Sequence, residues 1–224
     1  LGTTMFIGAV MGVLGSAASA WLLENYVFPN SFIILFGAAA GFITLSWLFL
    51  AMTREPVGVV EARDQNWPAY WKDLIRILKE DHNFRRFIIS NIIITFGAMG
   101  SGFVTISAIA RYNVSDATVG LYTLTMLIGQ AFGNLVLGWM ADRFGHKLSL
   151  EIGVLATLIA FILAVWMPWP GFYFVVYALL GINLSSGIVS GMLVVWEFCE
   201  TSRVPTYSGL VNTTRGIVGL VAPV

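Results

Sequence analysis

Apolar runs of about twenty residues, separated by short polar segments, dominate this chain of 224 residues. A helix rises about 1.5 Å per residue, so roughly 20 residues cross the ~30 Å hydrocarbon core of a bilayer. Charged residues make up 11% of the chain and hydrophobic residues 58%, whereas soluble domains carry about 25% charged residues. Backbone groups in lipid must bond within their own segment, which favours helices over the alternating strands of a barrel. The sequence therefore predicts an all-α, polytopic transmembrane helix bundle.

Six complete spans and the start of a seventh are expected from the apolar runs. Their approximate bounds are 2–23, 32–52, 87–110, 119–140, 148–167, 172–196 and 207–224. Because the first and last residues both fall inside apolar runs, we expect the chain to be part of a longer protein.

A charged segment lies between the second and third spans. Residues 54–86 hold thirteen of the 24 Asp, Glu, Lys and Arg residues. Pro56 and Pro68 bracket a loop, and the apolar residues after Pro68 recur on one helical face, which predicts an amphipathic helix on the membrane surface. If this segment is cytoplasmic, ten of the twelve Lys and Arg residues lie on that side. The positive-inside rule therefore predicts a cytoplasmic linker in a multi-pass protein of the plasma or inner cell membrane.

The connection between the fourth and fifth spans reads GWMADRFGHK. Gly138 permits close helix packing, and Gly145 permits a left-handed turn between two helices. Arg143 and Lys147 suit the cytoplasmic headgroups. Asp142 is unfavourable at a helix C-terminus, so we expect it to have a partner such as Arg143, Lys147 or a neighbouring helix N-terminus.

This turn resembles the signature loop of the major facilitator superfamily, G-x-x-x-D-R-x-G-R-K, with His146 where the family usually has Arg or Lys. The resemblance implies that the loop acts as a conformational latch between the two halves of a transporter. A plain positive-inside hairpin is the alternative. The expected latch residues are Gly138, Asp142, Arg143, Gly145 and Lys147, with Asn134 on the same helical face.

The same resemblance implies a domain organisation for the whole chain, as a fragment covering about the fifth to eleventh helices of the family. Residues 1–52 would form the last two helices of the N-terminal six-helix half. Residues 53–86 would be the central linker, and residues 87–224 would form helices seven to ten and the start of eleven.

Polar residues mark the helices that line the cavity in this family. In the seventh, eighth, tenth and eleventh helices the candidate substrate-binding residues are Asn91, Thr95, Gln130, Asn183, Asn212 and Arg215. The ninth helix is nearly pure apolar after Glu151, as an outer helix should be. For each single Asn or Gln, an interhelical hydrogen bond without a ligand role is an open alternative.

Arg215 is the sharpest candidate because it lies about eight residues, or ~12 Å, inside the expected start of its helix. An intramembrane arginine is costly and points to function or to a buried partner. It could hold an anionic substrate. The alternatives are a carboxylate or helix end outside this chain, or a helix that begins later than expected.

The leading functional prediction is a secondary active transporter that moves a small solute by alternating access. A ligand sensor or channel of the same fold is the alternative, followed by a membrane-embedded enzyme. His82 and His146 are isolated from any catalytic or metal-binding set, so we expect no enzyme activity, cofactor or metal. The carboxylates outside the charged segment lie at or beyond helix ends, so proton coupling would need an Asp or Glu outside this chain or another route of coupling. These carboxylates are Glu24, Asp116, Asp142, Glu151, Glu197 and Glu200.

The expected partners are a small-molecule substrate, a coupling proton if transport is proton-driven, and the lipid bilayer. A formal charge of zero argues against a nucleic-acid partner. Four small-residue pairs fit the GxxxG pattern that allows close helix approach. In a bundle of this size they favour intramolecular packing over dimerisation, so we expect a monomer; the pairs are Gly8 with Gly12, Gly37 with Gly41, Gly129 with Gly133, and Gly187 with Gly191.

Overall fold

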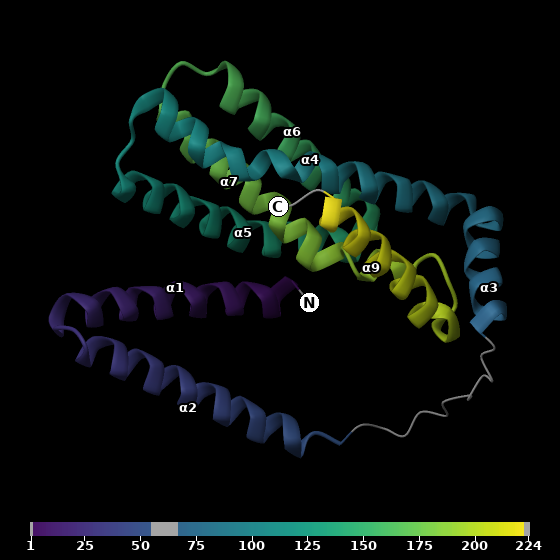
Figure 1. Cartoon of the computed structure of the whole chain (residues 1–224), viewed down its shortest axis with the longest axis horizontal. Coiled ribbons are helices and arrows are strands. Elements are labelled where there is room, and N and C mark those ends of the chain that lie inside the picture. Colours follow the sequence, from purple (N-terminus) through teal and green to yellow (C-terminus); the bar gives the residue numbers. More distant parts are fainter. Residues whose placement is uncertain (1, 55–66, 222–224) are drawn as a thin grey trace. The chain divides into compact units, whose positions relative to one another are not determined.

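The computed structural model describes residues 2–54 and 67–221, and that part of the chain contains helices and no strand (Figure 1). One compact unit, Val10–Asn66, contains most of α1 (Gly2–Asn25) and all of α2 (Asn30–Met52). The second unit comprises Leu1–Ala9 and Trp67–Val224. Its elements after the linker are α3 (Trp67–Glu80), α4 (His82–Tyr112), α5 (Asp116–Phe144), α6 (His146–Trp166), α7 (Phe172–Ser190), α8 (Leu193–Trp196), the 3-10 helix η1 (Thr201–Arg203) and α9 (Val204–Val221).

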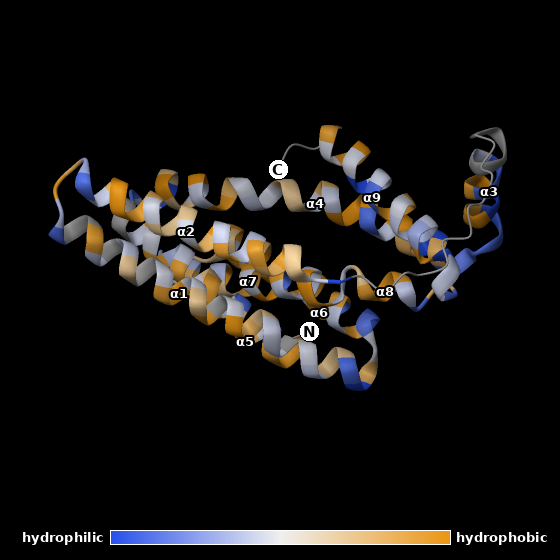
Figure 2. Ribbon diagram, turned by 90° about the horizontal axis from the view of Figure 1, so that it is seen from below, coloured by the Kyte–Doolittle hydropathy of each residue, from blue (hydrophilic) through white to orange (hydrophobic). Residues whose placement is uncertain are grey.

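Five helical segments of the described chain are long and apolar enough to cross a membrane, which confirms the predicted bundle. They are α2, α4, α5, α6 and the stretch Phe172–Trp196 that contains α7 and α8. In α1 the described apolar stretch, Thr3–Gly15, is shorter than a span. The last predicted span forms α9, which is helical but is not one of the five; Figure 2 shows a hydrophilic stretch in its middle.

The sixth predicted span is not one continuous helix. α7 ends at Ser190, and the short helix α8 begins only at Leu193. The N–H of Gly191 donates to the Gly187 carbonyl at 2.9 Å, which closes the last turn. Glycine weakens a helix interior because it loses more backbone freedom on folding than other residues do. The span predicted over 172–196 is confirmed as one stretch of membrane-crossing length, and the break between α7 and α8 lies within it.

Polar caps fix the corners between the helices. The Asp81 carboxylate accepts from the backbone N–H of Phe84 at 2.9 Å, which begins α4 and separates it from α3. The Ser115 hydroxyl accepts from the N–H of Thr118 at 3.3 Å and begins α5 in the same way. Such caps satisfy N–H groups that have no partner within the helix. Figure 1 shows α3 at a steep angle to α4, as expected for the amphipathic helix predicted after Pro68.

Small residues bring α7 into close contact with α5 and α6. A side chain on Gly129 of α5 would collide with the Ala178 carbonyl of α7, and one on Gly181 of α7 would collide with the Met126 carbonyl of α5. A side chain on Gly153 of α6 would collide with the Ser186 hydroxyl. In the apolar core of a membrane such close backbone approach is a main source of helix association. We call the close contacts between α5 and α7, made at Gly129 and at Gly181, the α5–α7 seam.

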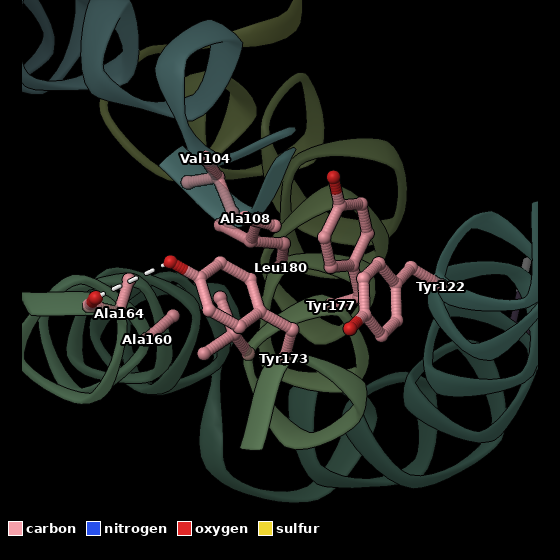
Figure 3. Packing of buried hydrophobic residues seen from close by; sticks show 9 residues of the cluster. Val104, Ala108, Tyr122, Ala160, Ala164, Tyr173, Tyr177 and Leu180 are labelled. Carbon is pink, nitrogen blue, oxygen red and sulfur yellow. Dashed lines mark hydrogen bonds between the residues drawn. The ribbon is translucent and has the colours of Figure 1, made fainter. Parts of the chain in front are cut away.

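A cluster of tyrosines joins α4, α5, α6 and α7 near the end of α4 that is away from α3, and Figure 3 shows how its side chains pack. Tyr122 of α5 stacks on Tyr177 of α7 with ring centroids 5.3 Å apart. Each buried hydroxyl has a partner, as buried tyrosines generally require. Tyr122 donates to the Pro170 carbonyl at 2.9 Å, Tyr177 bonds the Thr105 hydroxyl, and Tyr173 bonds the Ser107 hydroxyl at 3.0 Å.

Arg111, near the end of α4, closes the same end of the bundle. Its guanidinium donates to the carbonyls of Ala164 and Val165 at 2.8 and 3.0 Å. These are carbonyls of the last turn of α6, which have no partner within the helix and carry the negative end of its dipole. Arg111 is therefore accounted for by a structural role.

A second cluster, which we call the linker-end cluster, joins α3, α4, α8 and α9. Phe84 is fully buried, and its ring lies 4.4 Å from that of Tyr207 and 5.7 Å from that of Phe198, between ring centroids. Tyr207 also donates to the Asp81 carboxylate at 3.4 Å. The other buried members are Ile77, Ile88, Val194, Val195 and Val211.

Candidate functional site

Two of the predicted binding residues meet between α4 and α9. Arg215 of α9 donates from both Nε and Nη2 to the side-chain oxygen of Asn91 on α4, at 3.1 and 2.8 Å. The two residues are 124 positions apart in the sequence. The structure therefore brings together the charged candidate of the last predicted span and an amide of the third predicted span.

Local hydrogen bonds orient the Asn91 amide. Its Nδ2 donates to the Phe87 carbonyl one turn earlier at 3.0 Å. Because the amide nitrogen is held there, the amide oxygen is the atom presented to Arg215. Thr95, another predicted binding residue, donates its hydroxyl to the Asn91 carbonyl at 2.8 Å. Asn91, Thr95 and Arg215 thus form one connected polar group, which we call the α4–α9 polar group.

The α4–α9 polar group has a positive charge and no negative one. The ion pairs found among the described side chains involve Arg76, Arg203 and Lys147, and none of them involves Arg215. Arg76 and Arg203 both pair with Asp73 on α3, and Lys147 pairs with Glu151 on α6. Half-buried Arg215 therefore bonds to a neutral amide, within the part of the chain that the structure describes.

On α4 the polar group lies within the apolar part of the helix, roughly midway between its charged end and the depth of a bilayer centre. Asn91 comes five residues after Arg86, the last charged residue before the apolar part of α4. Five residues correspond to about 8 Å, or roughly a quarter of the hydrocarbon thickness. α9 begins at Val204, so Arg215 lies eleven residues from the start of its helix.

The other candidate residues lie elsewhere. The side-chain oxygen of Asn183 faces Gly153 of α6, at the α6–α7 contact and not at α9. Gln130 is half-buried on α5, where its backbone N–H lies close to Gly181. Asn212 is exposed on α9, one turn before Arg215. The structure therefore unites three of the six predicted binding residues.

Asn134 of α5 and two serines are the buried polar side chains without a hydrogen-bond partner among the described residues. Asn134 is only 2% exposed, and its side-chain oxygen is unpaired. The Ser149 hydroxyl of α6 and the Ser185 hydroxyl of α7 share this state. A Cβ on Gly133 would stand 2.7 Å from the Ser185 Cβ, so these serines belong to the tightly packed α5–α6–α7 region.

The predicted latch residues lie in the C-terminal part of α5, at Gly145 and in the first turn of α6. Gly145 has φ 91°, a backbone conformation that favours glycine. Gly138 is buried, while Asp142 is exposed and has no hydrogen bond or ion pair within the described residues. The two cations expected to pair with Asp142 have other partners. The guanidinium carbon of Arg143 lies 5.7 Å from the centre of the Trp139 ring, and Lys147 pairs with Glu151 at 3.3 Å.

His146, noted only as a departure from the family pattern, makes the contacts that join this turn to the end of α7. Its backbone N–H donates to the Glu197 carboxylate at 3.3 Å, and its Nδ1 lies 3.1 Å from the Ser190 hydroxyl. A carboxylate at the N-terminus of α6 is favoured by the helix dipole. The sequence signal for this contact was Glu197, an acidic residue directly after the predicted span 172–196.

No group of three or more His, Cys, Asp or Glu side chains that could hold a metal ion occurs in the described chain. The arrangement is a multi-pass helical membrane protein with a cationic polar group between two of its helices. The sequence model of the Major Facilitator Superfamily matches residues 1–223. The chain therefore belongs to the major facilitator superfamily, a family of membrane transporters for small molecules. Searches of curated proteins and of solved structures found no match.

Proposed function

We propose that this protein is a secondary active transporter that moves a small solute across the membrane by alternating access. The single observation that carries the proposal beyond the family is the α4–α9 polar group, because a charged side chain inside the apolar zone marks a solute pathway by default. In such transporters the solute is bound by polar groups between helices. Here the polar group lies between α4 and α9, which pack against each other.

In this proposal residues 1–52 belong to the N-terminal half, residues 53–86 are a cytoplasmic linker, and residues 87–224 belong to the C-terminal half. The proposal is supported by the amphipathic helix α3, which separates the two groups of spans. Residues 55–66, including Pro56, lie outside the described residues. We further infer that the protein acts as a monomer in the plasma or inner membrane, because Gly129 and Gly133 of α5 both pack against α7 within one chain.

Uptake into proteoliposomes tests the proposed function. The full-length protein would be reconstituted, and radiolabelled metabolites would be offered with an imposed pH, sodium or voltage gradient. We expect saturable accumulation of at least one solute against its own concentration gradient, and collapse of this accumulation when the driving gradient is dissipated. Solute binding without any flux would favour a sensor, and unsaturable downhill flux would favour a channel. Dependence on the pH gradient identifies a coupling proton.

The Asp142 turn is proposed as the conformational latch, and replacing Asp142 with Asn should slow conformational exchange. We expect a several-fold lower maximal transport rate with little change in half-saturating solute concentration, because Asp142 shares no hydrogen bond with the α4–α9 polar group among the described residues. Initial uptake rates over a range of solute concentrations provide the measurement. Glu200→Gln, which neutralises another exposed carboxylate near the same end, is the matched control and should transport normally. Equal rates for both variants would contradict the latch.

Cys199 tests the orientation of the linker end, since it is the one cysteine in the sequence and lies three residues after the end of α8. Burial raises the pKa of the Cys199 thiol; Asp81 also raises it, and Arg203 opposes the change. At neutral pH less thiolate is present than in free cysteine, so alkylation should be slow and should accelerate roughly tenfold per pH unit below the pKa.

The labelling experiment uses intact cells with Cys199 as the sole cysteine. A membrane-permeant maleimide should label Cys199 at this slow, pH-dependent rate, and an impermeant maleimide should label it only after the membrane is opened. Labelling of intact cells by the impermeant reagent would place the linker end outside and refute the proposed topology.

A further inference from the structure

Arg215 uses only one edge of its guanidinium in the described structure. Nε and Nη2 form the side edge, and both donate to the single oxygen of Asn91. The end edge, formed by Nη1 and the second hydrogen of Nη2, has no hydrogen-bond partner among the described residues. A guanidinium carries five N–H donors in a planar fork, so two parallel donors remain on this edge.

The end edge also carries an uncompensated charge. Asn91 supplies an oxygen but no negative charge, and the carboxylates of Asp81 and Asp73 on the neighbouring elements bond to other groups. Asp81 accepts from Phe84 and Tyr207, and Asp73 pairs with Arg76 and Arg203. A positive charge in an apolar medium is strongly destabilised unless an anion accompanies it. The α4–α9 polar group is therefore incomplete without an anion.

The geometry of the remaining donors selects the type of anion. Two parallel N–H groups match the two oxygens of a carboxylate, and such a bidentate pair is stronger and more specific than a single ionic contact. Asn91 is held by its own bond to the Phe87 carbonyl, so it fixes the orientation of the guanidinium in advance. Asn91 is thus a positioning residue, and Arg215 is the residue that would contact the solute.

We propose that the transported solute is a small carboxylate, and that its carboxyl group binds to the end edge of Arg215. This inference rests on the proposed transport function, because it names the substrate class of the same site. Isosteric amides bind poorly, because they bring no charge and present an NH2 group to a donor edge. Cationic solutes are excluded by repulsion.

Thermal unfolding of the purified full-length protein tests the inference with matched pairs of compounds. The pairs are lactate with lactamide, succinate with succinamide, and benzoate with benzamide. We expect at least one carboxylate to raise the Tm saturably, while its amide has no effect at the same concentration. The inference is overturned if no carboxylate raises the Tm more than its amide does. It is also overturned if inorganic phosphate is the only anion that raises the Tm.

Three variants assign the binding to Arg215. Arg215→Gln should raise the half-saturating carboxylate concentration at least about 30-fold, as expected when one partner of a desolvated charge pair is removed. Arg215→Lys should raise it less, because it keeps the charge but loses the fork. Arg86→Gln is the control, because it removes an exposed guanidinium from α4. This variant should bind the carboxylate as the wild type does. Unchanged carboxylate binding by Arg215→Gln contradicts the proposal.

Asn91→Asp keeps the test decisive if Arg215→Gln does not fold. This change places a carboxylate on the side edge of Arg215 and supplies the missing negative charge from within the protein. The ligand-free Tm should stay the same or rise, while the half-saturating carboxylate concentration should rise at least about tenfold. Retained carboxylate affinity in Asn91→Asp would contradict the inference.

The two proposals fail in distinguishable ways. Carboxylate-dependent stabilisation without uptake into proteoliposomes would overturn the transport function and leave the binding site standing. Gradient-driven uptake of neutral solutes, with no preference for carboxylates and no effect of Arg215→Gln, would overturn the carboxylate site and leave the transport function standing.

Discussion

Gly181→Ala is expected to destabilise the protein by roughly 2 to 3 kcal/mol, although alanine is the better helix former. Alanine in place of a helical glycine normally gains about 0.5 to 1 kcal/mol. At Gly181, however, the new Cβ would collide with the Met126 carbonyl and stand 2.8 Å from the backbone nitrogen of Gln130. Neither backbone atom can move aside as a flexible side chain could, so the overpacking cost outweighs the gain.

Gly187→Ala is the control for this prediction. Gly187 lies on the same helix, and a Cβ there would meet nothing within 4 Å. This variant should be as stable as the wild type or slightly more stable. The measurement is the free energy of unfolding in mixed micelles, taken from a denaturant titration of the full-length protein. Similar stabilities for Gly181→Ala and Gly187→Ala would refute the close approach of α5 and α7.

Phe84→Ala is expected to lower the free energy of unfolding by roughly 3 to 5 kcal/mol, the usual range for a fully buried phenylalanine. Phe84 is 0% exposed and contacts Tyr207 and Phe198 in the linker-end cluster. Its removal leaves a cavity where α4, α9 and the segment after α8 meet. The same titration in mixed micelles gives the loss in stability.

Two observations separate this effect from a general weakening of α4. Ile89→Ala truncates a side chain on the same helix that is 49% exposed, so its cost should stay within about 0.5 kcal/mol. Phe84→Ala should also speed the alkylation of Cys199, because the thiol directly follows Phe198 in this cluster. A loss below about 1 kcal/mol, with unchanged alkylation, would show that the cluster is not packed as described.

Local sequence patterns were sufficient to predict most of the helices. Apolar runs of spanning length predicted α2, α4, α5 and α6 within a few residues of their observed ends, and the stripe after Pro68 predicted α3. The ends were placed less well where a polar residue begins the helix. α4 starts at His82, five residues before its predicted start, because the Asp81 cap precedes the apolar run.

The site was less predictable because its contacts are between distant residues. Their positions within the expected spans identified Arg215 and Asn91 as candidates, but nothing in their spacing paired them. The helix pattern also could not tell which face of α7 carries Asn183, since Ser185 and Ser186 place polar atoms on several faces. The structure resolves this choice, because Gly153 leaves space on α6 that the Asn183 and Ser186 side chains fill.

The α5–α7 seam has a consequence for the synthesis of the protein. α5 and α6 leave the ribosome before α7, so the face of α5 with Gly129 must first lie without its final partner. A glycine surface has no polar side chain, and its backbone N–H and C=O groups are already bonded within the helix, so lipid can cover it at little cost. A chain truncated after α6 should therefore still insert α5 across the membrane. The order of insertion then follows the order of translation, and the seam closes when α7 arrives.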